Sequence, residues 1–245
     1  RNGYIGYNTI RGTRNDSIHM TVGKTLNGAS TYNSDTILVE RNHISYSNDD
    51  GIACVSGTGT SGVVVSNVTA RYNTVVNQYG GRGITVVGSF NCLYHDNYIE
   101  GGPNGRAGVM IASESNYNAG SNRGFVLRNN TIKEAGGTGT GHGAIHIFNS
   151  YPSSATSNVI DGITIEGNEV YRAKKDGLVI NGGGIIRNVT IKDTKFFAPA
   201  SGNGIVKVST ATNITETNNT ILTQAAYTGD KVPSSVGSGA GTSGS

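Results

Sequence analysis

Val and Ile recur along the chain at short, regular intervals, in runs of strand length separated by turn-forming residues. A motif Asn-x-(Ile/Val) marks the repeat. It begins at Asn8, Asn42, Asn73, Asn97, Asn130, Asn168 and Asn219, and Asp193-Thr194-Lys195-Phe196 fills the one gap. Each copy follows a strand-like run, such as 36–40 or 162–166, and precedes a Gly-rich turn and a second run, such as 50–55 or 82–87. The pattern predicts a repeating unit of strand, Asn turn, short strand, Gly turn and strand.

One such unit cannot bury its own apolar side chains, but stacked units can, because every coil pairs with the coils above and below. Asn suits the recurrent turn because it tolerates the left-handed conformation and hydrogen-bonds locally. In a stack, its amide can also bond the Asn of the next coil. A β-sandwich or a propeller has many short strands as well, but neither explains the same Asn turn at the same place in each unit.

The sequence therefore predicts an all-β chain folded as a right-handed parallel β-helix of about seven to eight coils. We expect residues 1–227 to form this β-helix domain and residues 228–245 to be a Gly/Ser-rich linker or tail. The chain opens inside a patterned segment without an initial Met. We therefore expect preceding coils from another segment of the same enzyme, and further modules beyond the tail.

Four insertions interrupt the repeat, and all of them follow the run after the Gly turn. They span residues 24–34, 56–61, 114–123 and 149–158. In a β-helix they should leave along one edge and form the wall of a groove. A solenoid also tolerates insertions at such an edge for steric reasons alone, so both interpretations stay open.

Composition excludes several classes of protein. The net charge is only +3, charged residues make up 14% of the chain, and no Lys/Arg cluster is present, so nucleic-acid binding has little support. No apolar run is long enough to span a membrane. The two cysteines, Cys54 and Cys92, lie in apolar strands, which favours buried free thiols over a disulfide. We expect a secreted protein without a cofactor or metal in its chemistry, and a structural calcium ion stays open.

The chemistry that the sequence offers is a cluster of aspartates. Aligning Ile18 with Ile52 places Asp16 beside Asp50 in the next coil, about one strand spacing (~4.8 Å) away, and Asp49 is adjacent in the chain. Like charges at this distance raise at least one pKa, so an acid and a base can coexist as glycosidic cleavage requires. The alternative is a set of solvated turn aspartates. Lys175-Asp176 falls at the corresponding place several coils away, and there we favour the solvated turn.

Two segments carry a family resemblance. Residues 14–19 (Arg-Asn-Asp-Ser-Ile-His) and 47–53 (Ser-Asn-Asp-Asp-Gly-Ile-Ala) resemble two blocks of the polygalacturonase-like β-helix glycoside hydrolases. The group includes the dextranases and the bacterial α-1,3-glucanases (mutanases, glycoside hydrolase family 87). Within it, this chain resembles the α-1,3-glucanases most. The resemblance implies an inverting hydrolase. It also implies that Asp49 or Asp50 is the general acid, and that the other two aspartates, Asp16 among them, activate a water.

The departures from this pattern concern the substrate. Polygalacturonases carry Gly-His-Gly one coil after the aspartate pair, where this chain has Gly81-Arg82-Gly83. They then carry Arg-Ile-Lys, which grips a uronate, where this chain has Met110-Ile111-Ala112. A neutral α-glucan, α-1,3-glucan first, is therefore the expected substrate. A dextranase-like or polygalacturonase-like hydrolase is the next alternative, and a non-catalytic glycan-binding β-helix (an adhesin or a phage spike) is the alternative from another class.

Several residues are candidates for binding the sugar chain. They are His19, Asn48, Arg82, Tyr32, Tyr79, Tyr117 and Tyr151. The chain has no Trp, so stacking on sugar rings falls to tyrosine, and three of these four tyrosines lie in the insertions. The structural alternatives are an exposed turn arginine and tyrosines that only anchor their loops.

Overall fold

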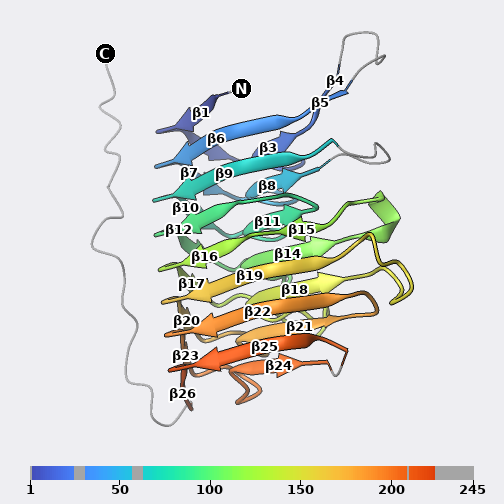
Figure 1. Ribbon diagram of the computed structural model, residues 1–245. Helices are drawn as coiled ribbons and strands as arrows, with labels where there is room; N and C mark the ends of the chain where they lie inside the picture. Colours follow the sequence, from blue (N-terminus) through green and yellow to red (C-terminus); the bar gives the residue numbers. More distant parts are fainter. Residues whose placement is uncertain (1, 25–30, 57–62, 209, 224–245) are drawn as a thin grey trace, which may run out of the picture.

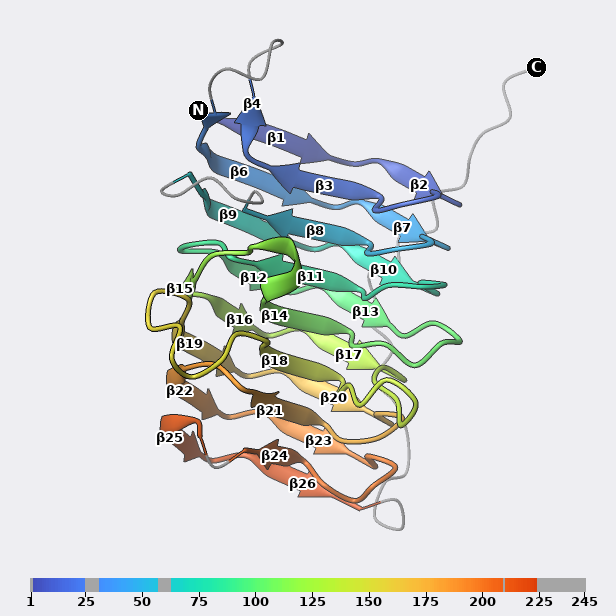
Figure 2. The same ribbon diagram turned by 90° about the vertical axis from the view of Figure 1, so that its right-hand side faces the viewer.

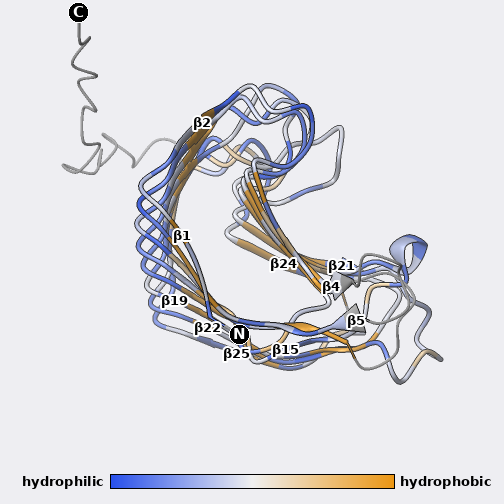
Figure 3. Ribbon diagram, turned by 90° about the horizontal axis from the view of Figure 1, so that it is seen from above, coloured by the Kyte–Doolittle hydropathy of each residue, from blue (hydrophilic) through white to orange (hydrophobic). Residues whose placement is uncertain are grey.

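The computed structural model describes residues 2–24, 31–56, 63–208 and 210–223. These residues form three parallel sheets that stack coil upon coil into a rod (Figures 1 and 2). Seen along the rod, sheets A and B form one side of each coil and sheet C lies across from them (Figure 3). The predicted parallel β-helix is confirmed, with eight strands in sheet B and seven in sheet C.

The strands of each sheet follow the chain in order. Sheet A contains β1 (Gly3–Gly6), β6 (Ser34–Glu40), β9 (Val65–Arg71), β12 (Leu93–His95), β16 (Val126–Arg128), β19 (Ile160–Glu166), β22 (Ile186–Lys192) and β25 (Thr212–Thr217), and β15 (Asn122–Arg123) pairs with β19. Sheet B contains β2 (Thr9–Arg11), β7 (His43–Ser45), β10 (Thr74–Val76), β13 (Tyr98–Glu100), β17 (Thr131–Lys133), β20 (Glu169–Tyr171), β23 (Lys195–Phe197) and β26 (Thr220–Leu222). Sheet C contains β3 (Ile18–Thr21), β8 (Ile52–Val55), β11 (Ile84–Val87), β14 (Val109–Ser113), β18 (Ile145–Asn149), β21 (Leu178–Gly182) and β24 (Ile205–Lys207).

The Asn ladder predicted from the repeat runs along the junction of sheets A and B. In each step, the amide Oδ1 accepts a hydrogen bond from the backbone N–H and another from the side chain of the Asn one coil earlier, at 2.9–3.0 Å. The ladder runs through Asn8, Asn42, Asn73, Asn97, Asn130 and Asn168. Thr194 takes the next position as predicted, and its N–H donates to Asn219 Oδ1 at 3.0 Å. The amides from Asn42 to Asn168 are buried, so losing one of them would leave unpaired backbone groups, at a cost of about 1–3 kcal/mol.

The core fills the inside of the coils with aliphatic side chains from all three sheets. Val39, Ile44 and Ile52, one from each sheet, are fully buried and belong to one continuous cluster. Cys54 and Cys92 lie in the same cluster as free thiols with their Sγ atoms 4.0 Å apart, which confirms the favoured interpretation. This packing fixes the register of sheet C, and therefore fixes which turn residues of neighbouring coils lie side by side.

The insertions leave the rod at the carboxyl end of the sheet C strands, as predicted. Segment 114–123 follows β14 and contains the 3₁₀ helix η1 (Ser115–Tyr117), and segment 149–158 begins at the end of β18. A short hairpin of β4 (Gly23–Lys24) and β5 (Thr31–Tyr32) flanks the first insertion. The rest of the first insertion (25–30) and most of the second (57–61) lie outside the described residues, as does the predicted tail at 228–245. In Figure 2, the described loops gather on one side of the rod.

In the described part of the chain, no helix has the length and apolar character needed to cross a membrane. Among the described residues, the strands β1, β2 and β3 each pair with one neighbouring strand. The expectation of preceding coils from another segment stays a prediction.

Candidate active site

The three aspartates lie in the turns that lead from sheet B into sheet C. Pairing of Ile18 with Ile52, and of Ile52 with Ile84, sets the register of β3, β8 and β11. The residue two positions before each isoleucine therefore occupies one column, which contains Asp16, Asp50 and Arg82. The predicted alignment of the aspartates is confirmed.

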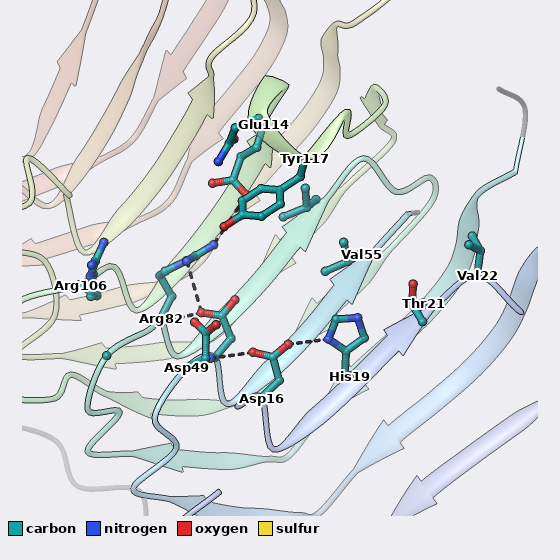
Figure 4. A pocket seen from close by; sticks show the side chains of 14 residues that line it. Asp16, His19, Thr21, Val22, Asp49, Val55, Arg82, Arg106, Glu114 and Tyr117 are labelled. Atoms are coloured by element: carbon teal, nitrogen blue, oxygen red, sulfur yellow. Dashed lines mark hydrogen bonds and ion pairs between the residues drawn. The ribbon is translucent and has the colours of Figure 1, made fainter. Parts of the chain in front are cut away.

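Direct hydrogen bonds connect this column. The backbone N–H of Asp50 donates to Asp16 Oδ1 at 2.9 Å, and the backbone N–H of Arg82 donates to Asp50 Oδ1 at 2.7 Å. Carboxylate oxygens of Asp16, Asp49 and Asp50 lie within 4.8 Å of one another (Figure 4). The turn of the next coil presses against the pair, because a Cβ on Gly81 would lie 2.6 Å from Asp49 Oδ1. Glycine at this position lets the backbone approach the carboxylates closely.

Burial separates Asp50 from its two neighbours. Asp50 is only 5% exposed, whereas Asp49 is exposed and Asp16 is intermediate. Loss of water around the Asp50 carboxylate raises its pKa to about 6, against the opposing effect of the Arg82 cation and its backbone N–H, and Asp49 raises it further. Asp50 can therefore hold a proton in mildly acidic solution, where an ordinary aspartate is ionised.

His19 extends the cluster along the outer face of β3. Its Nδ1 lies 2.5 Å from Asp16 Oδ2, and 43% of its side chain is exposed. The hydrogen bond to Asp16 raises the pKa of His19 despite partial burial. Asp16 thus has both oxygens engaged, one by the backbone of Asp50 and the other by the His19 ring, which fixes the orientation of its carboxylate.

Arg82 bridges the aspartates to a fourth acidic residue. Its Nε lies 3.3 Å from Asp50 Oδ1, and its Nη2 lies 3.9 Å from Glu114 Oε2. Burial disfavours the charged guanidinium, but Asp50, Glu114 and the other aspartates outweigh this and raise the pKa of Arg82. Arg82 thus stays a cation beside Asp50 and limits how far the pKa of Asp50 can rise.

The cluster opens into a cleft of about 860 Å³ on the outer face of sheet C. Figure 4 shows Asp16 and Asp49 at its base, with Arg82 reaching toward Glu114 and Tyr117 above them. Sequence reasoning identified Tyr117 but missed Glu114, Arg106 and Asn116, which also line the cleft. Glu114 and Asn116 belong to the insertion at 114–123, so the position of that insertion in the repeat could have identified them as cleft residues. Arg106 had no comparable signal.

The other proposed sugar-binding residues are placed less directly. Asn48, Tyr32, Tyr79 and Tyr151 are not among the cleft-lining residues of the described chain. Tyr79 is 61% exposed and precedes Gly80, which does line the cleft. Tyr32 is also exposed, at 39%, on β5. Their part in binding a long sugar chain stays a prediction.

Asp176 corrects one expectation. It lies in the same column as Asp50, and it is buried, only 4% exposed, so the interpretation as a solvated turn is wrong. Its Oδ1 accepts hydrogen bonds from Ser201 Oγ at 2.6 Å and Asn203 Nδ2 at 3.1 Å. Lys175 Nζ lies 3.9 Å from its other oxygen. Donors from its own turn and the next coil satisfy this carboxylate.

The three aspartates are also the one group of acidic, His or Cys residues in the described chain with the spacing to hold a metal ion. Carboxylate oxygens suit calcium or magnesium. However, Asp16 Oδ1 and Asp50 Oδ1 already accept backbone hydrogen bonds, so a cation would compete with N–H donors for two of the three carboxylates.

Comparisons with known proteins add information about the fold. No protein-family model and no curated protein matches the chain. Among solved structures, the catalytic domain of a GH87 alpha-1,3-glucanase in complex with tetrasaccharides is similar over 88% of this chain and 48% of that chain, with 16% identity and a TM-score of 0.44. A second structure of a GH87 alpha-1,3-glucanase catalytic domain is similar over 86% of this chain and 46% of that chain, with 17% identity and a TM-score of 0.43. The surface protein and adhesin PfbA of Streptococcus pneumoniae matches over 87% of this chain and 64% of that chain, with 12% identity and a TM-score of 0.38.

These matches have low identity and TM-scores below 0.5, so the fold assignment rests on the strand pairing of this chain. The chain spans about half the length of the two glucanase chains. A fold alone does not choose between hydrolysis and binding, so that choice rests on the residues of the site.

Proposed function

We propose that this chain is a glycoside hydrolase that cleaves a neutral α-glucan, with α-1,3-glucan as the preferred substrate and Asp16, Asp49 and Asp50 as the catalytic residues. The observation that carries the proposal is the convergence of three carboxylates at the base of a cleft, with one of them, Asp50, buried and its pKa raised to about 6. Solvated turn aspartates without a shared function are not expected to converge in one cleft.

The roles follow from the environment of each group. Asp50 holds the proton and donates it to the leaving glycosidic oxygen, because its pKa is the one raised toward neutrality. Asp16, held by the Asp50 backbone and His19, and Asp49, exposed to the cleft, orient and activate the attacking water. Arg82 balances the charge of Asp50, and Tyr117 offers an aromatic face to a sugar ring.

The stereochemical outcome rests on the family resemblance. Inverting enzymes usually hold their two carboxyl groups about 6.5–9.5 Å apart, and retaining enzymes about 5–5.5 Å. Here the oxygens lie within 4.8 Å, so spacing alone does not favour inversion. Our proposal of inversion is tested by proton NMR of the anomer released first from an α-1,3-linked oligosaccharide. A product with the anomeric configuration of the substrate would overturn it.

The substrate preference rests on the coil that follows that of Arg82. Met110 and Ala112 are buried there in a small apolar cluster with Val87, which lines the cleft, and none of the three can pair with a uronate. Arg106 is exposed at the cleft and forms no ion pair within the described chain, so it is the observation that favours the second candidate, a polygalacturonase-like hydrolase. The proposal gives this protein a polysaccharide partner and a site of action outside the cell.

Reducing-sugar release from α-1,3-glucan, dextran, pullulan and polygalacturonate tests the proposal. We expect cleavage of α-1,3-glucan and none of polygalacturonate. Efficient cleavage of polygalacturonate that disappears in Arg106→Gln would replace our proposal with the second candidate. Binding of a glucan without any release of sugar would favour the adhesin-like alternative.

The assignment of the proton to Asp50 has its own test, the pH–rate profile of Arg82→Gln. Removing the cation raises the pKa of Asp50 further, because Arg82 lowers it now. If Asp50 is the acid, activity is lost as pH rises through its pKa, so the alkaline limb should move to higher pH in the variant. A move of the acidic limb instead would make Asp50 the base.

A further inference from the structure

A second surface differs from the rest of the rod in the residues that occupy its turns. One residue before each step of the Asn ladder, the backbone is left-handed, with φ between 51° and 64°. From the first coil to the last, this column contains Tyr7, Arg41, Tyr72, Asp96, Asn129, Gly167, Asp193 and Asn218. The five later residues are types that tolerate this conformation, whereas a bulky side chain is rarely found there. The first three coils therefore accept backbone strain to place large side chains on the surface.

These side chains point outward and contact one another. Tyr7 is 70% exposed and Tyr72 is 46% exposed, and the guanidinium of Arg41 lies 5.9 Å and 5.1 Å from the two ring centroids. On the other flank of sheet B, Arg11 lies 4.9 Å from the ring of Tyr46, another left-handed tyrosine that is 49% exposed. We name these five residues the Tyr–Arg face. They border the outer surface of β2, β7 and β10.

The charges of this face are only partly paired. Cations on sheets A and B pair with acids on the neighbouring coil, as in Arg71–Glu40 at 2.8 Å beside this face and Lys192–Glu166 at 3.4 Å in the later coils. Arg11 and Arg41 are exposed, and neither has a carboxylate partner within the described chain. The Tyr–Arg face thus combines exposed aromatic rings with two guanidinium groups that form no ion pair within the described chain, and Glu40, whose pKa Arg41 helps to lower, offsets part of their charge.

We propose that the Tyr–Arg face binds a carboxylate-bearing polysaccharide. Sugar rings would stack on the tyrosines, and uronate carboxylates would pair with Arg11 and Arg41, since a guanidinium matches a carboxylate in shape and charge. Tyr7 and Tyr72 are two coils apart, ~9.6 Å, which leaves room for a short stretch of an extended sugar chain between the rings. The face lies across the coil from sheet C and its cleft (Figure 3), so this site is separate from the proposed hydrolase site and does not depend on it.

The test is affinity electrophoresis of the full chain in gels that contain alginate, a polymer of uronates, with dextran as the neutral comparison. We expect retardation in alginate and none in dextran. The main variant combines Tyr7→Asn, Arg41→Asn and Tyr72→Asn, which gives the first coils the residue that Asn129 provides later. Because Asn suits the left-handed backbone, the melting temperature should be unchanged or higher, while binding to alginate weakens about tenfold or more.

Two further variants separate binding from general charge and from folding. Lys195→Gln removes one positive charge that is paired with Glu169, and it should leave the retardation unchanged. Arg11→Gln, on an exposed strand position, should weaken binding without affecting the melting temperature. The proposal is overturned if the triple variant binds alginate like the parent chain, or if polyuridylate, a phosphodiester polyanion, is retained more tightly than alginate. Sugar release from a neutral α-glucan should be the same in all these variants, so a failure here is distinct from a failure of the proposed hydrolase.

Discussion

Asp50 and Asp176 occupy the same column of the β-helix and are buried to the same extent, yet their surroundings differ completely. Asp176 accepts hydrogen bonds from Ser201 and Asn203 and lies near Lys175. Asp50 has Asp49 and Asp16 as neighbours, and Arg82 Nε lies 3.3 Å from one of its oxygens. The fold provides a repeated buried turn position, and the adjacent coils decide whether a carboxylate there is a structural acceptor or a reactive acid. The predictions below separate these two outcomes.

The largest expected difference is in turnover. Asp50→Asn, Asp49→Asn and Asp16→Asn should each lower kcat on α-1,3-glucan by about 10²–10⁴-fold, because each removes a group that transfers a proton or activates water. Asp176→Asn is the matched control and should keep nearly normal kcat. Near-normal rates in all three site variants, with changes only in melting temperature, would show that these are turn aspartates.

The next difference is in the pH dependence of stability. The pKa of Asp50 is about 6 in the folded chain and 3.8 ordinarily, so the folded state binds more protons between these values. The free energy of unfolding should therefore fall as pH rises from about 4 to about 6, by about 3 kcal/mol through this group. Urea unfolding measures it. Asp50→Asn should flatten this interval.

His19 adds a smaller effect in the same direction. Its pKa is raised by Asp16, so its stabilising contribution is complete below pH 6.5 and is lost as pH rises through the raised pKa. His19→Gln should therefore reduce the free energy of unfolding at acidic pH and leave it nearly unchanged at alkaline pH. A uniform loss at every pH would mean that His19 acts by packing alone.

Asp176 should matter for stability in a different manner. Asp176→Ala removes the acceptor of Asn203 and one of the two acceptors of Ser201 Oγ, which should lower the free energy of unfolding by about 1–3 kcal/mol. Urea unfolding at pH 7 measures the loss, with kcat as the control. A large loss of kcat in a folded Asp176→Ala variant would contradict the separation of the two positions.

The smallest expected effect concerns the tyrosines. Tyr117→Ala removes an aromatic face that lines the cleft, so KM should rise about fivefold, which corresponds to about 1 kcal/mol. Tyr72→Ala, on the Tyr–Arg face, should leave KM unchanged for a short neutral oligosaccharide. An equal rise in KM for both variants would show that Tyr117 does not bind the sugar in the cleft.

Much of this comparison was predictable from the repeat. Ile18, Ile52 and Ile84 fix the strand register, so the neighbourhood of Asp16, Asp50 and Arg82 follows from the sequence. The insertions behave otherwise. Glu114 reaches Arg82 from a loop outside the repeat, where the period sets no position, and its contact was therefore invisible in the sequence. Arg106 was missed because the comparison with the polygalacturonase pattern considered only Met110 to Ala112 in that coil.

The sequence by itself determined the architecture, the Asn ladder and the convergence of three aspartates, because these depend on a period and on hydrogen bonds between equivalent residues. Only the tertiary structure decided that Asp50 is buried while Asp49 is exposed, and that Asp176 is buried as well. The physical reason is that burial, and with it the pKa of a carboxylate, depends on every atom that neighbouring coils and loops place around it. A periodic pattern specifies which residues are adjacent, but it does not specify how much water remains between them.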